Sequence, residues 1–185
     1  MILPIVAFGA PILREKCVDI TPEYFELETL LTNMWETMYE ASGVGIAAPQ
    51  INKAIRLFLI DTTPFVEDEE TDEVIVKQTF INARIIEETG EVWDFKEGCL
   101  SIPDIREDVS RKSTIKIEYF DENFKKHTDT YDGLTARVIQ HEYDHVNGIL
   151  FIDKISALRK RMIKGKLIDI SKGKVNAAYK MRFAR

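Results

Sequence analysis

The segment His141-Glu142-Tyr143-Asp144-His145 constrains this chain more than any other. Residues four apart lie on one face of an α-helix, so a helix here would direct both imidazoles at a single metal ion. A glutamate directly after the first histidine would lie beside that ion, where its carboxylate can exchange protons with a water molecule. The pattern therefore predicts a helix and indicates a metal-dependent hydrolase.

The third metal ligand has to come from another part of the chain. Neither histidine nor glutamate follows His145, so the downstream ligand that zinc proteases usually add to this motif is missing. Cys99 is the strongest candidate, because a thiolate is a good ligand for zinc or ferrous iron. Cys17, in a plain N-terminal segment, is the alternative. His127 falls on a predicted hairpin and is expected at the surface.

Hydrophobic spacing and capping residues predict the elements of secondary structure. Helices are predicted between Thr21 and Gly43, between Gly133 and Gly148, and from Ser156 to about Ile170. Strands are predicted at 56–60, 74–81, 84–88, 91–95, 114–120, 125–130 and 175–183. Because the strands follow one another instead of alternating with helices, we expect an α+β fold. Its mainly antiparallel strands would pack around a central helix that carries HEYDH, with one N-terminal and one C-terminal helix.

The bulk composition is that of a globular chain. With 185 residues, 45% hydrophobic and 30% charged, a single catalytic domain over residues 1–185 is expected. No apolar run is long enough to cross a membrane. The apolar N-terminus has no preceding basic residue and is interrupted by Pro4 and Pro11, which argues against a signal peptide. We therefore expect a cytoplasmic protein whose two cysteines are thiols or ligands and not a disulfide.

Charge is distributed unevenly along the chain. Residues 154–185 contain 11 of the 25 basic side chains and only one acid, Asp169. This basic C-terminal helix and tail is either a surface helix that keeps itself solvated or a contact for a polyanion such as RNA. The acidic run at 67–73 is expected to be a solvated loop.

Three blocks resemble the signature motifs of the peptide deformylase family, and they occur in the same order and at similar spacing. They are GVGIAAPQ at 43–50, EGCLS at 97–101 and HEYDHVNG at 141–148. The N-terminal IVAFGAPILR also resembles the start of that family, and the resemblance extends to Asp153. It implies a hydrolase that removes the formyl group from the N-terminal formyl-methionine of newly made proteins and releases formate.

The resemblance also implies roles for individual residues. The metal ligands would be Cys99, His141 and His145, and the metal would be Fe²⁺, for which Zn²⁺ or Ni²⁺ can substitute. Glu142 would take a proton from water and return it to the departing amine. The side-chain amide of Gln50 and the backbone N–H of Leu100 would stabilise the negative oxygen of the tetrahedral intermediate.

A substrate peptide would bind in an extended conformation. The backbones of Val44, Gly45 and Gly98 would pair with it as an added strand does. Its methionine side chain needs an apolar pocket, for which the candidates are Leu134, Val138 and Phe95. Arg106 matches a family arginine near the site, whereas Arg137 stands where an apolar residue is more usual.

Two other function classes stay open at the level of the residues. HExxH alone is also typical of metallopeptidases that cleave internal peptide bonds. The basic tail is compatible with a non-enzymatic RNA-binding module that holds a structural metal. In some bacterial deformylases the C-terminal helix docks on the ribosome, which implies the ribosome as a further partner beside N-formylmethionyl peptides.

Overall fold

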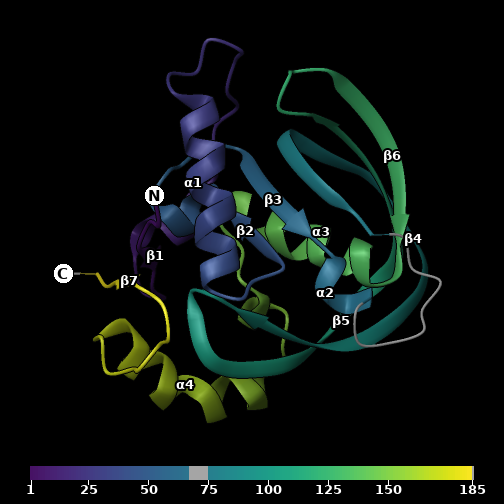
Figure 1. The fold of residues 1–185 in the computed structure, drawn as a ribbon. Coiled ribbons are helices and arrows are strands. Elements are labelled where there is room, and N and C mark those ends of the chain that lie inside the picture. The colour runs from purple at the N-terminus through teal and green to yellow at the C-terminus, as the bar shows by residue number, and fades with distance from the viewer. Residues whose placement is uncertain (67–74, 185) are drawn as a thin grey trace.

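The computed structural model describes residues 1–66 and 75–184 (Figure 1). The described strands are β1 (Ile5–Val6), β2 (Gly45–Ala47), β3 (Leu57–Asp61), β4 (Lys77–Cys99), β5 (Ile102–Phe120), β6 (Lys126–Asp132) and β7 (Met181–Arg182). The α-helices are α1 (Leu27–Glu40), α2 (Thr63–Val66), α3 (Gly133–Val146) and α4 (Ala157–Ser171). Short 3₁₀ helices are η1 (Pro11–Arg14), η2 (Ala48–Ile51) and η3 (Phe151–Asp153). The acidic run at 67–73, and residue 74 of a predicted strand, lie outside the described residues.

Five strands form one sheet in the order β2-β3-β4-β5-β6, and each neighbouring pair is antiparallel. The two ends of the chain form a second, parallel pair, β1 with β7. The larger sheet precedes α3 and α4 in the chain, without alternation of strands and helices. The predicted α+β class with mainly antiparallel strands is confirmed.

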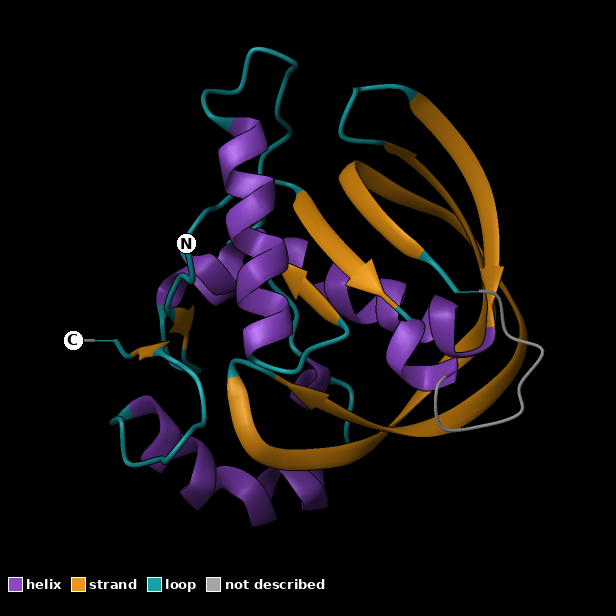
Figure 2. Cartoon of the chain, in the orientation of Figure 1, coloured by secondary structure: helices purple, strands orange, loops and turns teal. Residues whose placement is uncertain are grey.

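The two longest strands, β4 and β5, form a curved hairpin (Figure 2). Its register shifts at four places, one of them between Ile81 and Arg84. Such bulges bend a strand without ending it. The separate strands predicted at 74–81 and 84–88 are therefore wrong, because Asn82, at φ 53°, introduces a bulge and not a break.

Helix α3 contacts β2, β3, β5 and β6. Its buried apolar side chains belong to the same core cluster as the buried side chains of the sheet. The helix members of this cluster are Ala136, Val138, Ile139 and Val146, and the sheet members include Phe58, Phe80, Ile115 and Ile117. This packing places the HEYDH residues against the sheet (Figure 1).

Helix α1 begins at Leu27 and not at the predicted Thr21-Pro22-Glu23 pattern. Glu26 has φ 57°, a left-handed conformation that cannot continue an α-helix from the residues before it. Those residues form a turn instead, in which the backbone N–H of Tyr24 donates to the carbonyl of Thr21 at 3.0 Å. The N-terminal helix exists, but the capping pattern gave the wrong start.

In the C-terminal region, the predicted helix is present, but the predicted strand is much shorter than expected. Helix α4 is capped by Ser156, whose hydroxyl accepts from the backbone N–H of Arg159 at 3.3 Å. The strand predicted at 175–183 is reduced to Met181–Arg182. Among residues 1–66 and 75–184, no helix has the length and apolar character needed to cross a bilayer.

Candidate active site and metal centre

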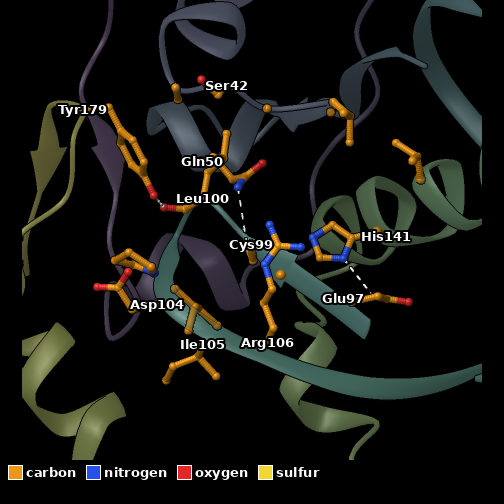
Figure 3. A pocket seen from close by; sticks show the side chains of 18 of the residues that line it. Ser42, Gln50, Glu97, Cys99, Leu100, Asp104, Ile105, Arg106, His141 and Tyr179 are labelled. Atoms are coloured by element: carbon orange, nitrogen blue, oxygen red, sulfur yellow. Dashed lines mark hydrogen bonds and ion pairs between the residues drawn. The ribbon is translucent and has the colours of Figure 1, made fainter. Parts of the chain in front are cut away.

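A cleft of about 800 Å³ lies where several segments of the chain meet (Figure 3). The glycine-rich loop around β2, the end of β4, and helix α3 contribute the three sequence blocks. The start of β5 and the segment Asn176–Tyr179 of the C-terminal tail line the cleft too. Strand β4 ends at Cys99 and β5 begins at Ile102, so Leu100 and Ser101 form a tight turn at the cleft wall.

Three side chains of the types that bind metals converge beside this turn. The Sγ atom of Cys99 and one ring nitrogen each of His141 and His145 lie within 4.8 Å of one another. Sγ is 3.2 Å from Nε2 of His145. Helix α3 presents the two imidazoles and the β4–β5 turn presents the thiol.

The other two sequence candidates for a ligand are not in this group. Cys17 is buried in the core cluster that lies between the sheet and α3. His127, half-buried on β6, has Nε2 2.7 Å from a carboxylate oxygen of Asp121 in the same hairpin. Of the three candidates for the third ligand, all of which lie in the described part of the chain, only Cys99 approaches the histidine pair.

The donor set fits a divalent transition metal. One thiol and two imidazoles are ligands that zinc and ferrous iron accept, and three protein ligands leave one coordination position for water or substrate. Nδ1 of His141 lies 3.0 Å from a carboxylate oxygen of Glu97, which leaves Nε2 as the atom that could bind a metal. Burial lowers the pKa of His145 well below 6.5, which keeps its imidazole neutral and able to bind.

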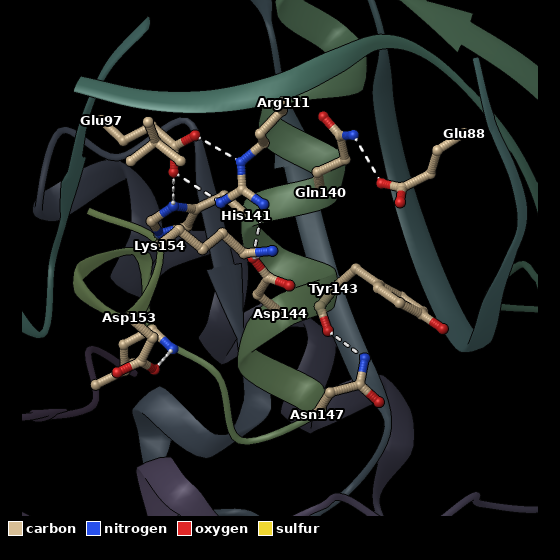
Figure 4. Close-up of polar contacts among 12 residues, drawn as sticks. Glu88, Glu97, Arg111, Gln140, His141, Tyr143, Asp144, Asn147, Asp153 and Lys154 are labelled. Carbon is tan, nitrogen blue, oxygen red and sulfur yellow. Dashed lines mark hydrogen bonds and ion pairs between the residues drawn. The ribbon is translucent and has the colours of Figure 1, made fainter. Parts of the chain in front are cut away.

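Glu97 belongs to a buried network of charges (Figure 4). Its two oxygens accept from Nε and Nη2 of Arg111 at 2.6 and 2.9 Å, and Nη1 of Arg111 donates to Asp144 at 2.6 Å. Burial by itself would raise the pKa of Glu97, but the hydrogen bonds from Arg111 and His141 outweigh it and hold this pKa well below 4.5. The carboxylate is therefore ionised and fixes the orientation of the His141 ring.

Arg137 occupies a helix position where the sequence analysis noted that an apolar residue is more usual. It is buried, and it donates to Glu97 at 3.1 Å and to the carbonyls of Val109 and Trp93, each at 2.8 Å. Its guanidinium also lies 4.5 Å from the ring centre of Trp93. Arg137 therefore joins the charge network to one wall of the cleft, which it also lines.

Glu142 is buried, and its Oε2 has no hydrogen-bond partner among the described protein atoms. Burial raises its pKa to about 7. The backbone of Gly45 packs against this carboxylate, because a Cβ atom added at Gly45 would lie 2.5 Å from Oε1. An acid with a pKa close to neutrality can both accept and donate a proton at physiological pH.

The amide of Gln50 is oriented by the backbone. Its Oε1 accepts from the N–H of Ala47 at 2.8 Å, so Nε2 faces the cleft. Nε2 lies 3.6 Å from Sγ of Cys99 and 3.3 Å from Oγ of Ser101 (Figure 3). The side chain is only 1% exposed, so this donor is held beside the converging ligand atoms.

Most of the residues that the sequence analysis assigned to the substrate line the cleft. They are Val44, Gly45, Gly98, Arg106, Val138 and Phe95. Leu134 does not line it, because it lies at the start of α3, two turns before His141. A Cβ atom added at Gly98 would lie 3.3 Å from Cγ of Arg106, so the arginine side chain packs directly on the Gly98 backbone.

Sequence reasoning missed four residues at this site. Glu97, Arg111 and Asp144 form the buried network, and the hydroxyl of Tyr179 donates to the carbonyl of Leu100 at 2.7 Å. The positions of Glu97 inside EGCLS and of Asp144 inside HEYDH are signals that could have pointed to a role. Arg111 and Tyr179 carry no local signal, because their partners lie far away in the chain.

The fold and this cluster of thiol, imidazoles and buried carboxylate are together typical of a metal-dependent hydrolase. Comparison with known proteins narrows the class. The family model for polypeptide deformylase matches residues 2–161. The chain belongs to the polypeptide deformylase family, and it is a hydrolase of protein biosynthesis that acts on the N-formyl amide of nascent peptides.

Individual relatives agree with the family match. The peptide deformylase of Christiangramia forsetii is 60% identical over 189 aligned positions, which cover 99% of this chain and 96% of the relative. The peptide deformylase of Flavobacterium johnsoniae is 56% identical, and the alignment covers 100% of this chain and 97% of that relative. A crystal structure of a peptide deformylase from Legionella pneumophila superposes with a TM-score of 0.80 at 34% identity, over 94% of this chain and 98% of that one.

Proposed function

We propose that this protein removes the formyl group from the N-terminal formyl-methionine of newly made proteins and releases formate. The proposal rests on one observation above all, the convergence of Cys99, His141 and His145 within 4.8 Å beside the buried carboxylate of Glu142. We propose that these three residues hold Fe²⁺, which membership of the family favours. Zn²⁺ or Ni²⁺ could substitute, because the same donor types suit them.

A divalent metal held by these ligands would act as a Lewis acid and would lower the pKa of a bound water molecule to about 7. Glu142 takes a proton from the attacking water, whose oxygen bonds to the formyl carbon. Glu142 then gives that proton to the amine nitrogen as the C–N bond breaks. Formate and a free N-terminal amine are the products. A pKa of about 7 suits Glu142 for both transfers.

Gln50 and Leu100 stabilise the tetrahedral intermediate. The Nε2 donor of Gln50 is fixed by the bond from Ala47 to its other amide atom, so little reorganisation is needed when charge develops on the formyl oxygen. The backbone N–H of Leu100 supplies the second donor from the β4–β5 turn. Removal of one such donor costs on the order of a hundredfold in rate.

The substrate peptide binds along the glycine-rich loop and the end of β4. The backbones of Val44, Gly45 and Gly98 pair with it as an added strand does. The methionine side chain enters the part of the cleft lined by Val138 and Phe95. Arg106, which lines the cleft and packs on the Gly98 backbone, is a further contact for the peptide.

We propose that residues 1–185 act as one catalytic domain in the cytoplasm, where formylated chains leave the ribosome. Helix α4 exposes Lys160, Arg161 and Lys164, which suit contact with ribosomal RNA. Reversal of Arg161 and Lys164 to glutamate should weaken co-sedimentation with ribosomes at low salt. It should leave the hydrolysis of free peptides unchanged. Equal co-sedimentation would exclude this role of α4.

The deciding experiment measures formate release from formyl-Met-Ala-Ser by anaerobically purified protein of known metal content. Glu142→Gln should lower kcat by at least about a hundredfold while the metal content is retained. Glu28→Gln, on the exposed face of α1, serves as the matched control and should remain active. Cleavage of unformylated casein that depends on Glu142, without formate release, would instead identify a metallopeptidase.

A further inference from the structure

The C-terminal tail returns to the N-terminus and is fixed there. In the β1–β7 pair, the backbone N–H of Ile5 donates to Lys180 at 2.9 Å, and that of Ala7 donates to Arg182 at 2.8 Å. The side chain of Met181 packs against a core cluster that includes residues of β1 and α4. The tail is therefore an integral part of the fold, although the family match ends at residue 161.

This path brings the segment just before β7 to the cleft. Asn176, Ala177, Ala178 and Tyr179 all line it. Tyr179 points at Leu100 and lies on the side of Leu100 away from His141 (Figure 3). Its hydroxyl donates to the Leu100 carbonyl at 2.7 Å. A residue near the end of the chain thus contacts the turn that carries a proposed catalytic donor.

The turn is held from both ends of the chain. Tyr179 holds the carbonyl of Leu100, and the backbone N–H of Phe8 donates to the carbonyl of Ser101 at 2.8 Å. A hydrogen bond to the Leu100 carbonyl restricts rotation about the Leu100 Cα–C bond and so holds the plane of the Leu100–Ser101 peptide unit. The Leu100 N–H belongs to the preceding peptide unit, which meets this plane at the Leu100 Cα, so holding the turn limits the direction of that N–H as well.

Tyr179 is suited to this task by its surroundings. Its ring packs against the core cluster beneath α1, which restricts its rotation. Burial raises the pKa of its phenol to about 12, so the hydroxyl stays protonated and remains a donor at neutral pH.

We propose that Tyr179 is a positioning residue for deformylation, and that it holds the Leu100–Ser101 turn so that the Leu100 N–H faces the formyl oxygen. Asn176–Tyr179 then form one wall of the substrate cleft. The inference rests on the proposed function, and adds to it a requirement for the tail. Because the Leu100 donor acts on charge that develops in the transition state, loss of the Tyr179 hydroxyl should lower kcat more than it raises KM.

Tyr179→Phe in the full chain tests this, since it removes only the hydroxyl. One hydrogen bond contributes about 1 kcal/mol, so kcat on free formyl-Met-Ala-Ser should fall about fivefold while KM changes less than about twofold. The amide nitrogen resonance of Ser101 should shift, because this nitrogen shares its peptide unit with the Leu100 carbonyl. Metal content should be retained, and the melting temperature should fall by no more than about 2–4 °C.

Tyr131→Phe is the matched control. Its hydroxyl lies 3.1 Å from that of Tyr119 on the neighbouring strand, and Tyr131 does not line the cleft. This variant should keep kcat, KM and the Ser101 resonance. Free peptides are used without ribosomes, so a loss of ribosome docking cannot imitate the expected result.

The outcomes separate this inference from the proposed function. If the wild type releases formate but Tyr179→Phe keeps its kcat, or loses only substrate affinity, the positioning role is wrong and the proposed function stands. An unshifted Ser101 resonance would also overturn the positioning role. A wild type that releases no formate would overturn the proposed function and the inference with it.

Discussion

A carboxylate oxygen of Glu97 lies 3.0 Å from Nδ1 of His141, and both oxygens of the same carboxylate accept from Arg111. The first residue of EGCLS thus holds a histidine of HEYDH from 44 positions away in the chain. A carboxylate that orients a ligand ring reduces the cost of arranging that ring when a metal binds. The two sequence blocks are therefore coupled through this contact as well as through Cys99.

Glu97→Gln should weaken metal binding by about 10- to 100-fold, because the amide holds His141 less strongly than a carboxylate does. Competition with a chromogenic chelator measures the affinity directly. Glu107→Gln is the control, since Glu107 is also a buried acid on the hairpin, but it pairs with Arg159 on α4. Equal metal affinity in the two variants would refute the orienting role of Glu97.

Gly45→Ala should impair catalysis while leaving the fold in place. The new methyl group would lie 2.5 Å from Oε1 of Glu142, so the carboxylate has to move away from its position. Displacement of a general base costs about 100-fold in kcat or more. Steady-state kinetics on a formylated peptide, together with circular dichroism, check the prediction. Wild-type kcat would show that the Glu142 position is not critical.

Gly165→Ala provides the contrasting glycine substitution. A Cβ atom at Gly165 would meet nothing within 4 Å, and the residue lies inside α4. Alanine loses less conformational entropy than glycine when a helix forms, so this variant should gain about 0.5–1 kcal/mol of unfolding free energy. Urea denaturation measures the gain, and activity on free peptides should not change.

Arg111→Met should destabilise the protein by about 3–5 kcal/mol, because it leaves Glu97 and Asp144 as buried charges without their main partner. Arg84→Met removes an exposed pair with Asp19 and should cost less than about 1 kcal/mol. Urea denaturation at neutral pH compares the two. Similar losses in both variants would contradict the dependence on burial.

Stability should fall at alkaline pH through Cys17. Burial raises the pKa of this thiol from 9.0 to about 11. Between these values the unfolded chain has lost the thiol proton and the folded chain retains it, so rising pH favours unfolding. The unfolding free energy of the wild type should therefore decline more steeply from pH 9 to 11 than that of Cys17→Ala. Parallel pH profiles would show that Cys17 does not contribute.

Much of the fold could be predicted from local patterns. The spacing within HEYDH and the glycine at 133 predicted a helix that the structure has at Gly133–Val146, and Ser156 predicted the start of α4. These features depend on residues within one or two turns of each other. The start of α1 was missed because Glu26 adopts a left-handed conformation, and the β4 bulge was missed because it depends on the pairing with β5.

By itself, the sequence determined which chemistry the chain can supply, namely a thiol, two imidazoles at helical spacing, and an adjacent carboxylic acid. Only the tertiary structure decided that Arg111 pairs with Glu97 beside His141. It also decided that Arg137 is buried against Glu97, and that the hydroxyl of Tyr179 contacts the carbonyl of Leu100. The physical reason is distance along the chain. Ligand type and helical spacing are local properties, whereas a buried charge or hydroxyl acquires its partner only when the sheet, α3 and the tail pack together.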